Sequence, residues 1–461
     1  MWKHEWVVPT EKTPNPVSMK DLRKISLTSE FSLVFEGIIK DWIMEDIEPN
    51  VDRSQFGNRK GTSTEHLMVK LMDKILNLLD MNNNQSAVIA SLVDWASAFD
   101  RQDATKAIEK FIKMGVRPAV IPVLVSYLSD RQMQVRYNDR YSGTHKLPGD
   151  GPQGTLLGLI EYFVQSNDNA DCVEEDLRFK FVDDLSVLEL VMLAGLLTEY
   201  NFNQHIASDI GIDEKYVPSS SLETQDHLNE ISDWTDLNLM KLNKDKTNYM
   251  VFSRSDTEFA TRLSIQGETI ERIEETKLVG VWLTTWLDWT KNTKEICRKA
   301  YARITMITKL KYVGVPKEDL THIYILYVRS LLEYCSVVWH STLTAEQSHN
   351  LERVQKLCLK IILGQKYNGY ENALEECELE TLSQRRESKC LKFALKSLLH
   401  PIHCEMFPVN PQVLSSPYAI RSSEHFIVNH AKSESYRQSA IPYFQIMLNT
   451  YVKNQQKTRA A

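Results

Sequence analysis

The sequence predicts an α+β fold in which buried strands and helices alternate over the first half of the chain and helices dominate the second half. The apolar, partly β-branched run Ser86–Val93 is typical of a buried strand. In Arg178–Val187, alternating residues around an acidic pair indicate two short strands joined by a tight turn. In Leu351–Ile362, apolar residues recur at helical spacing.

Helices and a second β-rich stretch complete the predicted order of elements. Asp103–Met114 and Pro118–Ser129 have helical patterns, and Leu263–Leu283 is β-rich with glycines as turn residues. The polar end of the chain, Lys453–Ala461, is expected to be frayed. These patterns divide the chain into residues 1–60, 61–255, 256–365 and 366–461.

The composition is that of an ordinary globular protein of two or three domains. The 461 residues are 43% hydrophobic and 25% charged. The longest apolar run, Val187–Leu197, contains Glu189 and is shorter than the roughly 20 residues that cross a bilayer. The first residues lack the apolar core of a signal peptide, so we expect an intracellular protein of the nucleus or cytoplasm, without membrane association. The seven cysteines form no C-x-x-C pair, which favours free thiols.

Charge is distributed unevenly along the chain. The formal net charge of −7 does not by itself favour a nucleic-acid binder. The helical segment Trp289–Val313, however, holds seven Lys or Arg residues and one acid, Glu295, which gives a local charge of +6. Both a solvated helix face and a surface that contacts phosphates would have this composition.

Three motifs carry candidate chemistry, and each has a simpler explanation when taken alone. Asp94 follows the first predicted strand, where it is either a functional carboxylate or a helix N-cap. Asp183 and Asp184 lie at the predicted hairpin tip, where adjacent carboxylates repel unless a cation such as magnesium bridges them, although aspartate is also common in turns. The Gly- and Pro-rich loop Pro148–Thr155 opens a helix, whose N-terminus attracts phosphate.

The order of these motifs is more specific than any one of them. A strand-end aspartate, a Gly-Pro-Gln-Gly loop before a helix, and a hairpin with two hydrophobic residues before Asp-Asp follow one another as in reverse transcriptases. The chain resembles the polymerases of non-LTR retrotransposons, especially the jockey-like group. Other segments that resemble this family in order are Asp21–Thr28, Gln55–Thr64, Ser126–Arg131, Leu242–Thr247, Lys277–Val281, Leu332–Trp339 and Leu351–Gln355.

The resemblance implies a right-hand polymerase with fingers, palm and a helical thumb. Residues 1–85 would form the fingers and lead-in, and residues 86–285 the palm with interleaved fingers elements. Residues 286–365 would form the thumb, and residues 366–461 a C-terminal helical extension with a frayed tail. An antiparallel sheet in the palm would carry the catalytic carboxylates.

The resemblance also implies an RNA-directed DNA polymerase that uses an RNA template, a DNA primer and deoxynucleoside triphosphates. Asp94, Asp183 and Asp184 would be the catalytic, metal-binding carboxylates, for two magnesium ions or manganese in their place. The residues implied in nucleotide binding are Arg23, Phe99, Gln153, Gly154 and Lys246. Those implied in contacts with the primer–template backbone are Lys291, Lys294, Arg298, Lys299 and Arg303.

Several of these implied roles compete with structural ones. Phe99 matches the residue that excludes a ribose 2′-hydroxyl, but it would also fit as a core phenylalanine. Arg23 matches an arginine that contacts triphosphate oxygens. Lys246 matches a lysine near the pyrophosphate, and a solvated lysine is the alternative.

The chain departs from the family pattern at a few positions. Lys24 stands where proline is usual, Leu159 where the loop normally has proline, and Glu161 where an apolar residue is usual. The acidic segment Asn167–Asp176 has no assigned role. The endonuclease region that usually precedes the polymerase is not part of this sequence, so we expect a fragment or degraded copy of a longer element protein.

Two other classes of function remain open at this point. One is a non-catalytic relic or repurposed nucleic-acid-binding protein that keeps the fold. The other is a helical scaffold or interaction protein built on residues 290–461. Nucleotide incorporation separates the first from an enzyme, and deletion of residues 290–461 separates the second.

Overall fold

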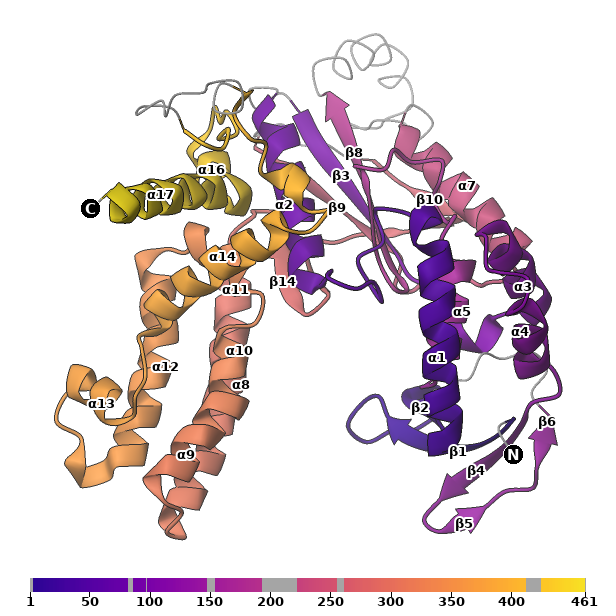
Figure 1. Cartoon of the computed structure of the whole chain (residues 1–461), viewed down its shortest axis with the longest axis horizontal. Coiled ribbons are helices and arrows are strands. Elements are labelled where there is room, and N and C mark those ends of the chain that lie inside the picture. The colour runs from indigo at the N-terminus through magenta and orange to yellow at the C-terminus, as the bar shows by residue number, and fades with distance from the viewer. Residues whose placement is uncertain are drawn as a thin grey trace, which may run out of the picture.

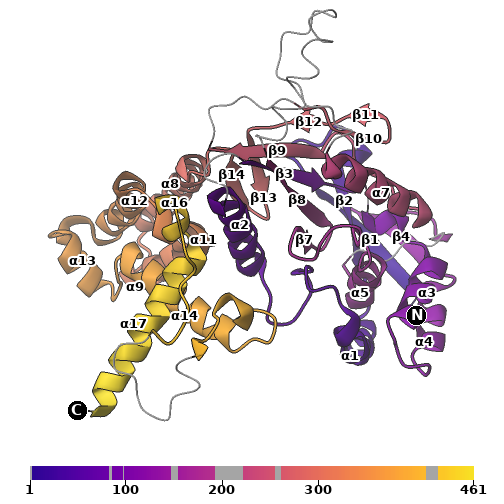
Figure 2. The same ribbon diagram turned by 90° about the horizontal axis from the view of Figure 1, so that it is seen from above.

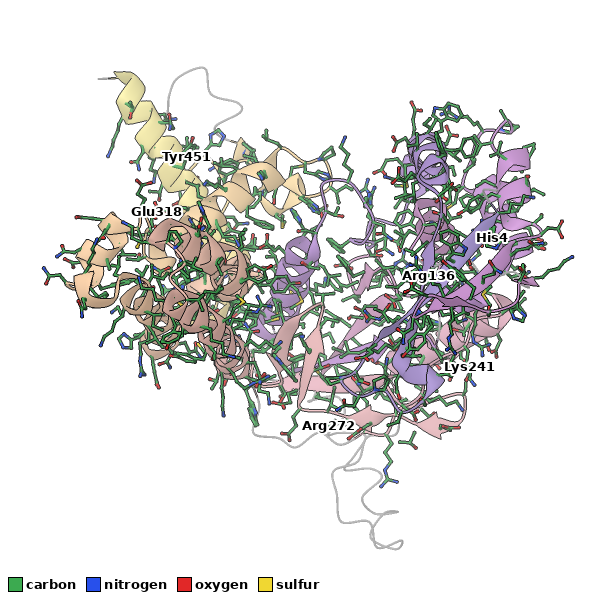
Figure 3. The ribbon with its side chains drawn as sticks, turned by 90° about the horizontal axis from the view of Figure 1, so that it is seen from below. His4, Arg136, Lys241, Arg272, Glu318 and Tyr451 are labelled. Atoms are coloured by element: carbon green, nitrogen blue, oxygen red, sulfur yellow. The ribbon has the colours of Figure 1, made fainter. Side chains whose placement is uncertain are left out.

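The computed structural model describes residues 3–81, 86–96, 98–146, 154–192, 222–254, 261–411 and 424–460. Two lobes extend from a central sheet toward the same side, a mixed lobe that contains the N-terminus and a helical lobe from the second half of the chain (Figure 1). Figure 3 shows both lobes from below, with His4 and Arg136 in the mixed lobe and Glu318 in the helical lobe. This arrangement matches the expected one, so the mixed lobe, the central sheet and the helical lobe are called fingers, palm and thumb below.

The central sheet has five strands in the order β12-β9-β3-β8-β7. Their bounds are Glu271–Arg272 (β12), Asn248–Ser253 (β9), Ser86–Val93 (β3), Asp184–Met192 (β8) and Arg178–Phe181 (β7). All neighbours are antiparallel except β9 and β12. The strand Ser86–Val93 and the β7–β8 hairpin were both predicted correctly, although β8 runs five residues beyond the expected Val187, to Met192.

Both faces of β3 are covered, which explains its continuous apolar run. On one face, Val88 and Ala90 pack in the same core as helix α2 (Thr64–Met81). On the other, Ala87 and Ile89 pack with helices α5 (Leu156–Gln165) and α7 (Glu223–Leu237). Figure 2 shows α2 on one side of the sheet and α5 with α7 on the other.

The fingers combine a second sheet with a small helical core. In this sheet β1 (His4–Glu11) pairs antiparallel with β2 (Leu22–Leu27) and parallel with β4 (Gln132–Tyr137), next to the short strands β5 (Arg140–Tyr141) and β6 (His145–Lys146). Helices α1 (Glu30–Ile47), α3 (Ala104–Lys113) and α4 (Ile121–Leu128) share a core with α5. The two helices predicted between the palm strands, α3 and α4, are therefore present.

The rest of the chain forms the thumb and the C-terminal extension. The hairpins β10–β11 (Ser264–Ile265, Glu268–Thr269) and β13–β14 (Glu275–Leu278, Val281–Thr284) precede the helices. The thumb comprises α8 (Thr290–Tyr312), α9 (Lys317–Ile323), η5 (Tyr324–Arg329), α10 (Ser330–Leu332), α11 (Ser336–Trp339) and α12 (Ala345–Leu363). The extension comprises α13 (Tyr370–Glu376), α14 (Leu382–Leu398), α16 (Glu434–Arg437) and α17 (Ala440–Ala460).

One core joins the palm, the thumb and the extension. Val88 of the sheet, Leu71 of α2, Ile304 of the thumb and Phe444 of α17 belong to the same buried cluster. The extension is therefore packed as part of the folded unit. Among the helices of the described residues, none has both the length and the apolar character needed to cross a bilayer.

The end of the chain differs from expectation. We expected a frayed tail from Lys453, but α17 continues as helix to Ala460. Its last turns expose lysine and glutamine side chains, which are good helix formers. Local propensity therefore extends the helix beyond Leu448, its last fully buried core residue.

Candidate active site

The register of the central sheet brings the three aspartates to one end of it. Val93 pairs with Leu185, so Asp94, the next residue along β3, lies beside the turn between β7 and β8. Asp183 is in that turn and Asp184 is the first residue of β8. Residues 90 positions apart in the sequence therefore meet because β3 and β8 are antiparallel neighbours.

Asp94 is held by the turn Leu242–Thr247, one of the segments that carried the resemblance. Asn243 donates its backbone N–H to the carbonyl of Asp94 and its side-chain Nδ2–H to Asp94 Oδ2, both at 2.8 Å. Lys246 Nζ lies 3.8 Å from the same carboxylate oxygen. The alternative reading of Asp94 as a helix N-cap is wrong, since a turn and a short 3₁₀ helix (Ala98–Arg101) follow it.

The fold leaves the carboxylates of the hairpin under mutual repulsion. Burial raises the pKa of Asp184 to about 6, and repulsion by Asp183 and Asp94 adds to the rise. Burial also raises the pKa of Asp183, and Asp94 adds to this, whereas Lys246 and Arg23 act against it. The pKa of the buried Tyr162 phenol rises well above its ordinary value, first from burial and then from the same three carboxylates. The site is thus a half-buried patch of excess negative charge.

This patch offers the carboxylate oxygens that magnesium prefers as ligands, but too few of them to fill the coordination shell of the ion. Carboxylate oxygens are hard ligands, and a divalent cation would relieve the repulsion that raises the two pKa values. Within the described residues, no three His, Cys, Asp or Glu side chains are arranged to hold a metal ion. The carboxylates fit a metal that takes part of its coordination shell from other molecules, as magnesium does with substrate phosphates.

Three of the residues implied in nucleotide binding, Arg23, Phe99 and Lys246, lie around the same end of the sheet. Arg23 is exposed on β2 and is near enough to Asp183 to lower its pKa. Phe99 is half-buried, with its ring centroid 5.0 Å from that of Tyr162. Gly154 has a φ of +109°, and a Cβ there would lie 3.3 Å from the carbonyl oxygen of Ser26. Gln153 lies outside the described residues.

Gly154 therefore lets its loop approach β2, the strand that carries Arg23. The nearby start of α5 serves a different purpose from the one that we expected. Instead of a free anion site, Glu36 of α1 accepts hydrogen bonds from the N–H groups of Leu156 and Leu157, at 2.9 and 3.2 Å. A buried carboxylate therefore already occupies this helix N-terminus, and its negative charge would oppose the binding of phosphate there.

The basic helix α8 is only partly available to a ligand. Lys291 pairs with Glu275 at 2.8 Å and Arg298 with Glu295 at 2.9 Å. Arg303 donates to the backbone carbonyl of a residue in η5. Burial and the neighbouring Lys277 lower the pKa of Lys299. Lys294 is exposed and has no ion pair within the described part of the chain.

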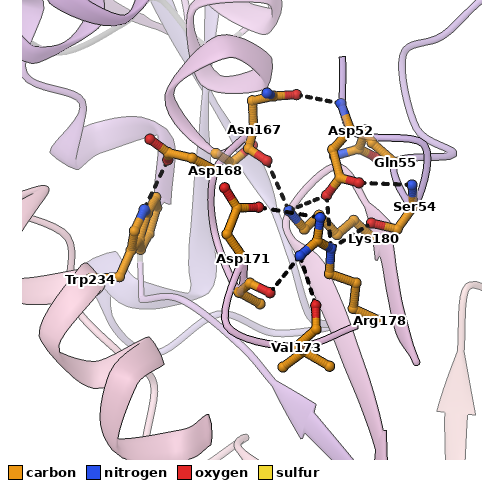
Figure 4. A network of polar contacts seen from close by, with 12 residues as sticks. Asp52, Ser54, Gln55, Asn167, Asp168, Asp171, Val173, Arg178, Lys180 and Trp234 are labelled. Carbon is orange, nitrogen blue, oxygen red and sulfur yellow. Dashed lines mark hydrogen bonds and ion pairs between the residues drawn. The ribbon is translucent and has the colours of Figure 1, made fainter. Parts of the chain in front are cut away.

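The acidic segment Asn167–Asp176 proves to be structural. Asp168 accepts from Lys110 and Trp234, and Asp171 pairs with Arg178 at 3.3 Å. Asp176 pairs with Lys74 of α2. Figure 4 shows part of this network behind the hairpin. The segment therefore neutralises cations of the palm and does not add to the charge of the site.

Sequence reasoning missed three residues of the site. Glu36 and Tyr162 gave no signal, because each acts through contacts with residues distant in sequence. Gln55 lies in a segment that resembles the family, but nothing local assigned it a contact with the hairpin. Its Oε1 accepts from the N–H of Val182 at 3.1 Å.

An antiparallel sheet with three carboxylates gathered at one end is the arrangement expected of a polymerase palm. The chain is similar to the "Probable RNA-directed DNA polymerase from transposon BS" of Drosophila melanogaster, with 25% identity over 372 residues, 77% of this chain and 37% of that protein. It is also similar to the "RNA-directed DNA polymerase from mobile element jockey" of the same organism, with 20% identity over 331 residues, 69% of this chain and 33% of that protein. These similarities agree with the resemblance to polymerases of non-LTR elements that the sequence motifs indicated.

The chain spans about a third of the length of these relatives. No protein-family model matches it. Among solved structures, two of Candida tropicalis telomerase, one apo and one with a TWJ fragment of telomeric RNA, each align at 12% identity and a TM-score of 0.42. They cover 85% and 86% of this chain and 61% and 57% of the telomerase chain, respectively. This likeness is too distant to carry an argument.

Proposed function

We propose that the chain is an RNA-directed DNA polymerase, which extends a DNA primer with deoxynucleoside triphosphates on an RNA template. The observation that carries this proposal is the meeting of Asp94, Asp183 and Asp184 at one end of the sheet, where the fold leaves their charge without a full complement of cations. Similarity to RNA-directed DNA polymerases supports the choice of template and product.

The carboxylates of Asp94 and Asp183 would hold two magnesium ions, or manganese ions, with Asp184 beside them. When bound, such ions lower the pKa of a primer 3′-hydroxyl and stabilise the charge of the leaving pyrophosphate. Asn243 fixes the orientation of the Asp94 carboxylate through its hydrogen bond. Lys246, close to Asp94, would contact phosphate oxygens, and Arg23 would offer a planar guanidinium from the fingers.

Phe99 and Tyr162 would form the surface under the nucleotide sugar. Their rings lie 5.0 Å apart, and Tyr162 is buried. An aromatic ring beneath the sugar excludes a 2′-hydroxyl by contact and so selects deoxynucleotides. Exposed cations of α8, Lys294 first among them, would contact the primer–template backbone.

The test is primer extension on poly-rA/oligo-dT with and without magnesium. The wild-type chain should incorporate dTMP only with the divalent ion, and Asp183→Ala should abolish incorporation. Asp41→Ala removes an exposed carboxylate on α1 that makes no contact with the three aspartates among the described residues, and should leave the rate unchanged. An absence of incorporation, or incorporation that Asp183→Ala does not affect, would overturn the proposal in favour of a non-catalytic nucleic-acid binder.

A separate scaffold in residues 290–461 gains no support from the packing. Thumb and extension helices share one core with α2 and the palm sheet. Deletion of residues 290–461 should therefore destabilise the palm and abolish activity. A deletion variant that keeps polymerase activity would favour the scaffold reading.

A further inference from the structure

The turn that carries Asp183 has an unusual backbone at the residue before it. Val182 has a φ of +59°, in the left-handed region. Valine is β-branched and rarely adopts this conformation, which persists only where the surroundings enforce it. The direction of the Asp183 side chain depends on this turn. Whatever holds Val182 in place therefore also positions the carboxylate.

A segment from before α2 runs alongside β7 and ends on this turn. The N–H of Lys180 donates to the carbonyl of Ser54 at 2.9 Å, and the N–H of Phe56 donates to the carbonyl of Lys180 at 2.8 Å. Gln55 is thereby paired with Lys180 and is 2% exposed. Its Oε1 accepts from the N–H of Val182 at 3.1 Å and from the N–H of Gly57 at 2.8 Å.

Gly57 brings this segment into direct contact with the turn. A Cβ at position 57 would lie 2.5 Å from the backbone nitrogen of Val182 and 2.6 Å from its Cγ2. Only glycine fits at position 57, because a Cβ there would collide with a backbone atom, which cannot move aside as a side chain could. Gln55 and Gly57 therefore act on the same peptide group, the first by a hydrogen bond and the second by close packing.

The segment is itself firmly anchored behind the hairpin. The Asp52 carboxylate pairs with Lys180 Nζ at 2.6 Å and with Arg178 Nε at 3.2 Å. Lys180 Nζ also donates to the carbonyl of Asn167, whose side chain accepts from the N–H of Asp52 (Figure 4). Lys180 and Asp52 are almost fully buried, so this pair fixes the segment and β7 as one unit.

We propose that Gln55 is a positioning residue for Asp183, which holds Val182 in its left-handed conformation through the carboxamide oxygen. The Nε2 group of Gln55 is buried without a hydrogen-bond partner among the described residues. The residue thus serves the fold through its oxygen alone. This inference rests on the proposed polymerase function for its kinetic consequence, but its structural part can be measured separately.

The kinetic test compares Gln55→Met with the double variant Gln55→Met/Val182→Gly on poly-rA/oligo-dT. Methionine has a similar length but removes the acceptor. We expect kcat to fall by about 10- to 100-fold, with the KM for dTTP changed less than about threefold, because the metal-binding carboxylate is displaced rather than the nucleotide. Glycine adopts positive φ without cost, so the double variant should regain at least about tenfold of the lost rate.

Gln445→Met is the matched control. Gln445 is also fully buried, and its side chain makes hydrogen bonds to Met406 and Asn429, but it lies in the extension. The Gln445→Met variant should lower thermal stability without the fall in kcat that is expected of Gln55→Met. If Gln55→Met does not fold, Gln55→Asn keeps a buried amide that is one methylene too short to reach Val182, and should give the same kinetic pattern.

Hydrogen–deuterium exchange gives a readout that does not need activity. Peptides that cover residues 178–187 should exchange at least about tenfold faster in Gln55→Met than in wild type, and no faster in Gln445→Met. An unchanged hairpin exchange rate would overturn the positioning role, as would a loss of kcat that Val182→Gly does not rescue. If the wild type incorporates no nucleotide, the proposed function fails while the exchange experiment still decides the role of Gln55.

Discussion

The carboxylates at the sheet end and the cations of α8 differ in how far the fold neutralises their charge. Asp183 and Asp184 are half-buried and repel each other and Asp94, with Lys246 and Arg23 as the opposing charges. In contrast, Lys291 and Arg298 of α8 have acidic partners within 3 Å. A charge that its own fold leaves uncompensated marks a place where a ligand completes the structure, whereas a compensated charge stabilises the protein by itself.

The largest expected effect is the loss of nucleotide incorporation when the uncompensated charge of Asp183 is removed. If Asp183 holds a metal ion as proposed, Asp183→Asn should lower nucleotide incorporation on the order of 10³-fold, because one carboxylate oxygen of the site is lost. The same change should raise the free energy of unfolding by about 1 kcal/mol at pH 7, because it removes repulsion with Asp184 and Asp94. Primer extension and urea unfolding measure the two quantities. A variant that is both inactive and less stable would contradict the view of the site as a strained charge cluster.

Loss of stability, not a gain, is expected when the buried ion pair between Lys180 and Asp52 is broken. Lys180→Met leaves Asp52 with Arg178 as its remaining ion-pair partner. It should lower the free energy of unfolding by about 3 kcal/mol or more. Lys40→Met breaks an exposed pair with Asp41 and should change stability by less than about 1 kcal/mol. Equal effects of the two variants in urea unfolding would show that burial does not distinguish these pairs.

Three stacked histidines have no acidic partner among the described residues, and two of them, His66 and His403, are buried. The rings of His66 and His403 lie 3.9 Å apart, and His400 stacks on His403 at 4.7 Å. Burial lowers the pKa of His403 to about 2, and His66, Lys70, His400 and Arg59 add to this. Burial lowers the pKa of His66 to about 4.

Because these pKa values lie below the ordinary 6.5, the unfolded chain binds protons first as the pH falls. Stability should therefore decrease between pH 6.5 and pH 4, by about 1 kcal/mol per pH unit for each histidine. Urea unfolding at pH 7.5, 6.5 and 5.5 measures this slope. The raised pKa values of Asp184 and Asp73 make stability rise as the pH falls, opposite to the histidines. The pH slope of the wild type is therefore compared with that of His403→Phe, in which stability should depend less on pH. An identical slope in that variant would exclude the stack as its source.

Local patterns and distant contacts differ in how well the sequence predicts them. The strand Ser86–Val93 and the Asp-Asp hairpin followed from periodicity, because their burial repeats with the strand geometry. The Glu36 cap on α5 and the Gln55 contact with Val182 join residues 120 and 127 positions apart. No local pattern specifies such pairs, since either partner could be satisfied by many others. The Glu36 contact at the start of α5 was not predicted for this reason.

The availability of the α8 cations was not predictable either, because it depends on which acids the fold brings beside them. Glu275 comes from the strand β13, and Glu295 from the preceding turn of α8 itself. Only the second partner is visible as a helical spacing of three residues. The local charge of +6 therefore overstated what the helix can offer to a nucleic acid.

The smallest expected effect is on nucleic-acid binding, when a lysine of α8 without an acidic partner is compared with a paired arginine of the same helix. Lys294→Ala removes an exposed lysine, whereas Arg298→Ala removes an arginine that Glu295 already neutralises. If α8 contacts the primer–template backbone, Lys294→Ala should weaken binding a few-fold and reduce the slope of log K against log salt by about 1. Arg298→Ala should change both less, because Glu295 already engages the Arg298 guanidinium and competes with a phosphate for it. Fluorescence anisotropy of a labelled RNA–DNA duplex at several salt concentrations measures both slopes. Equal slopes for the two variants and the wild type would remove α8 from the nucleic-acid contact and leave its cations as a solvated helix face.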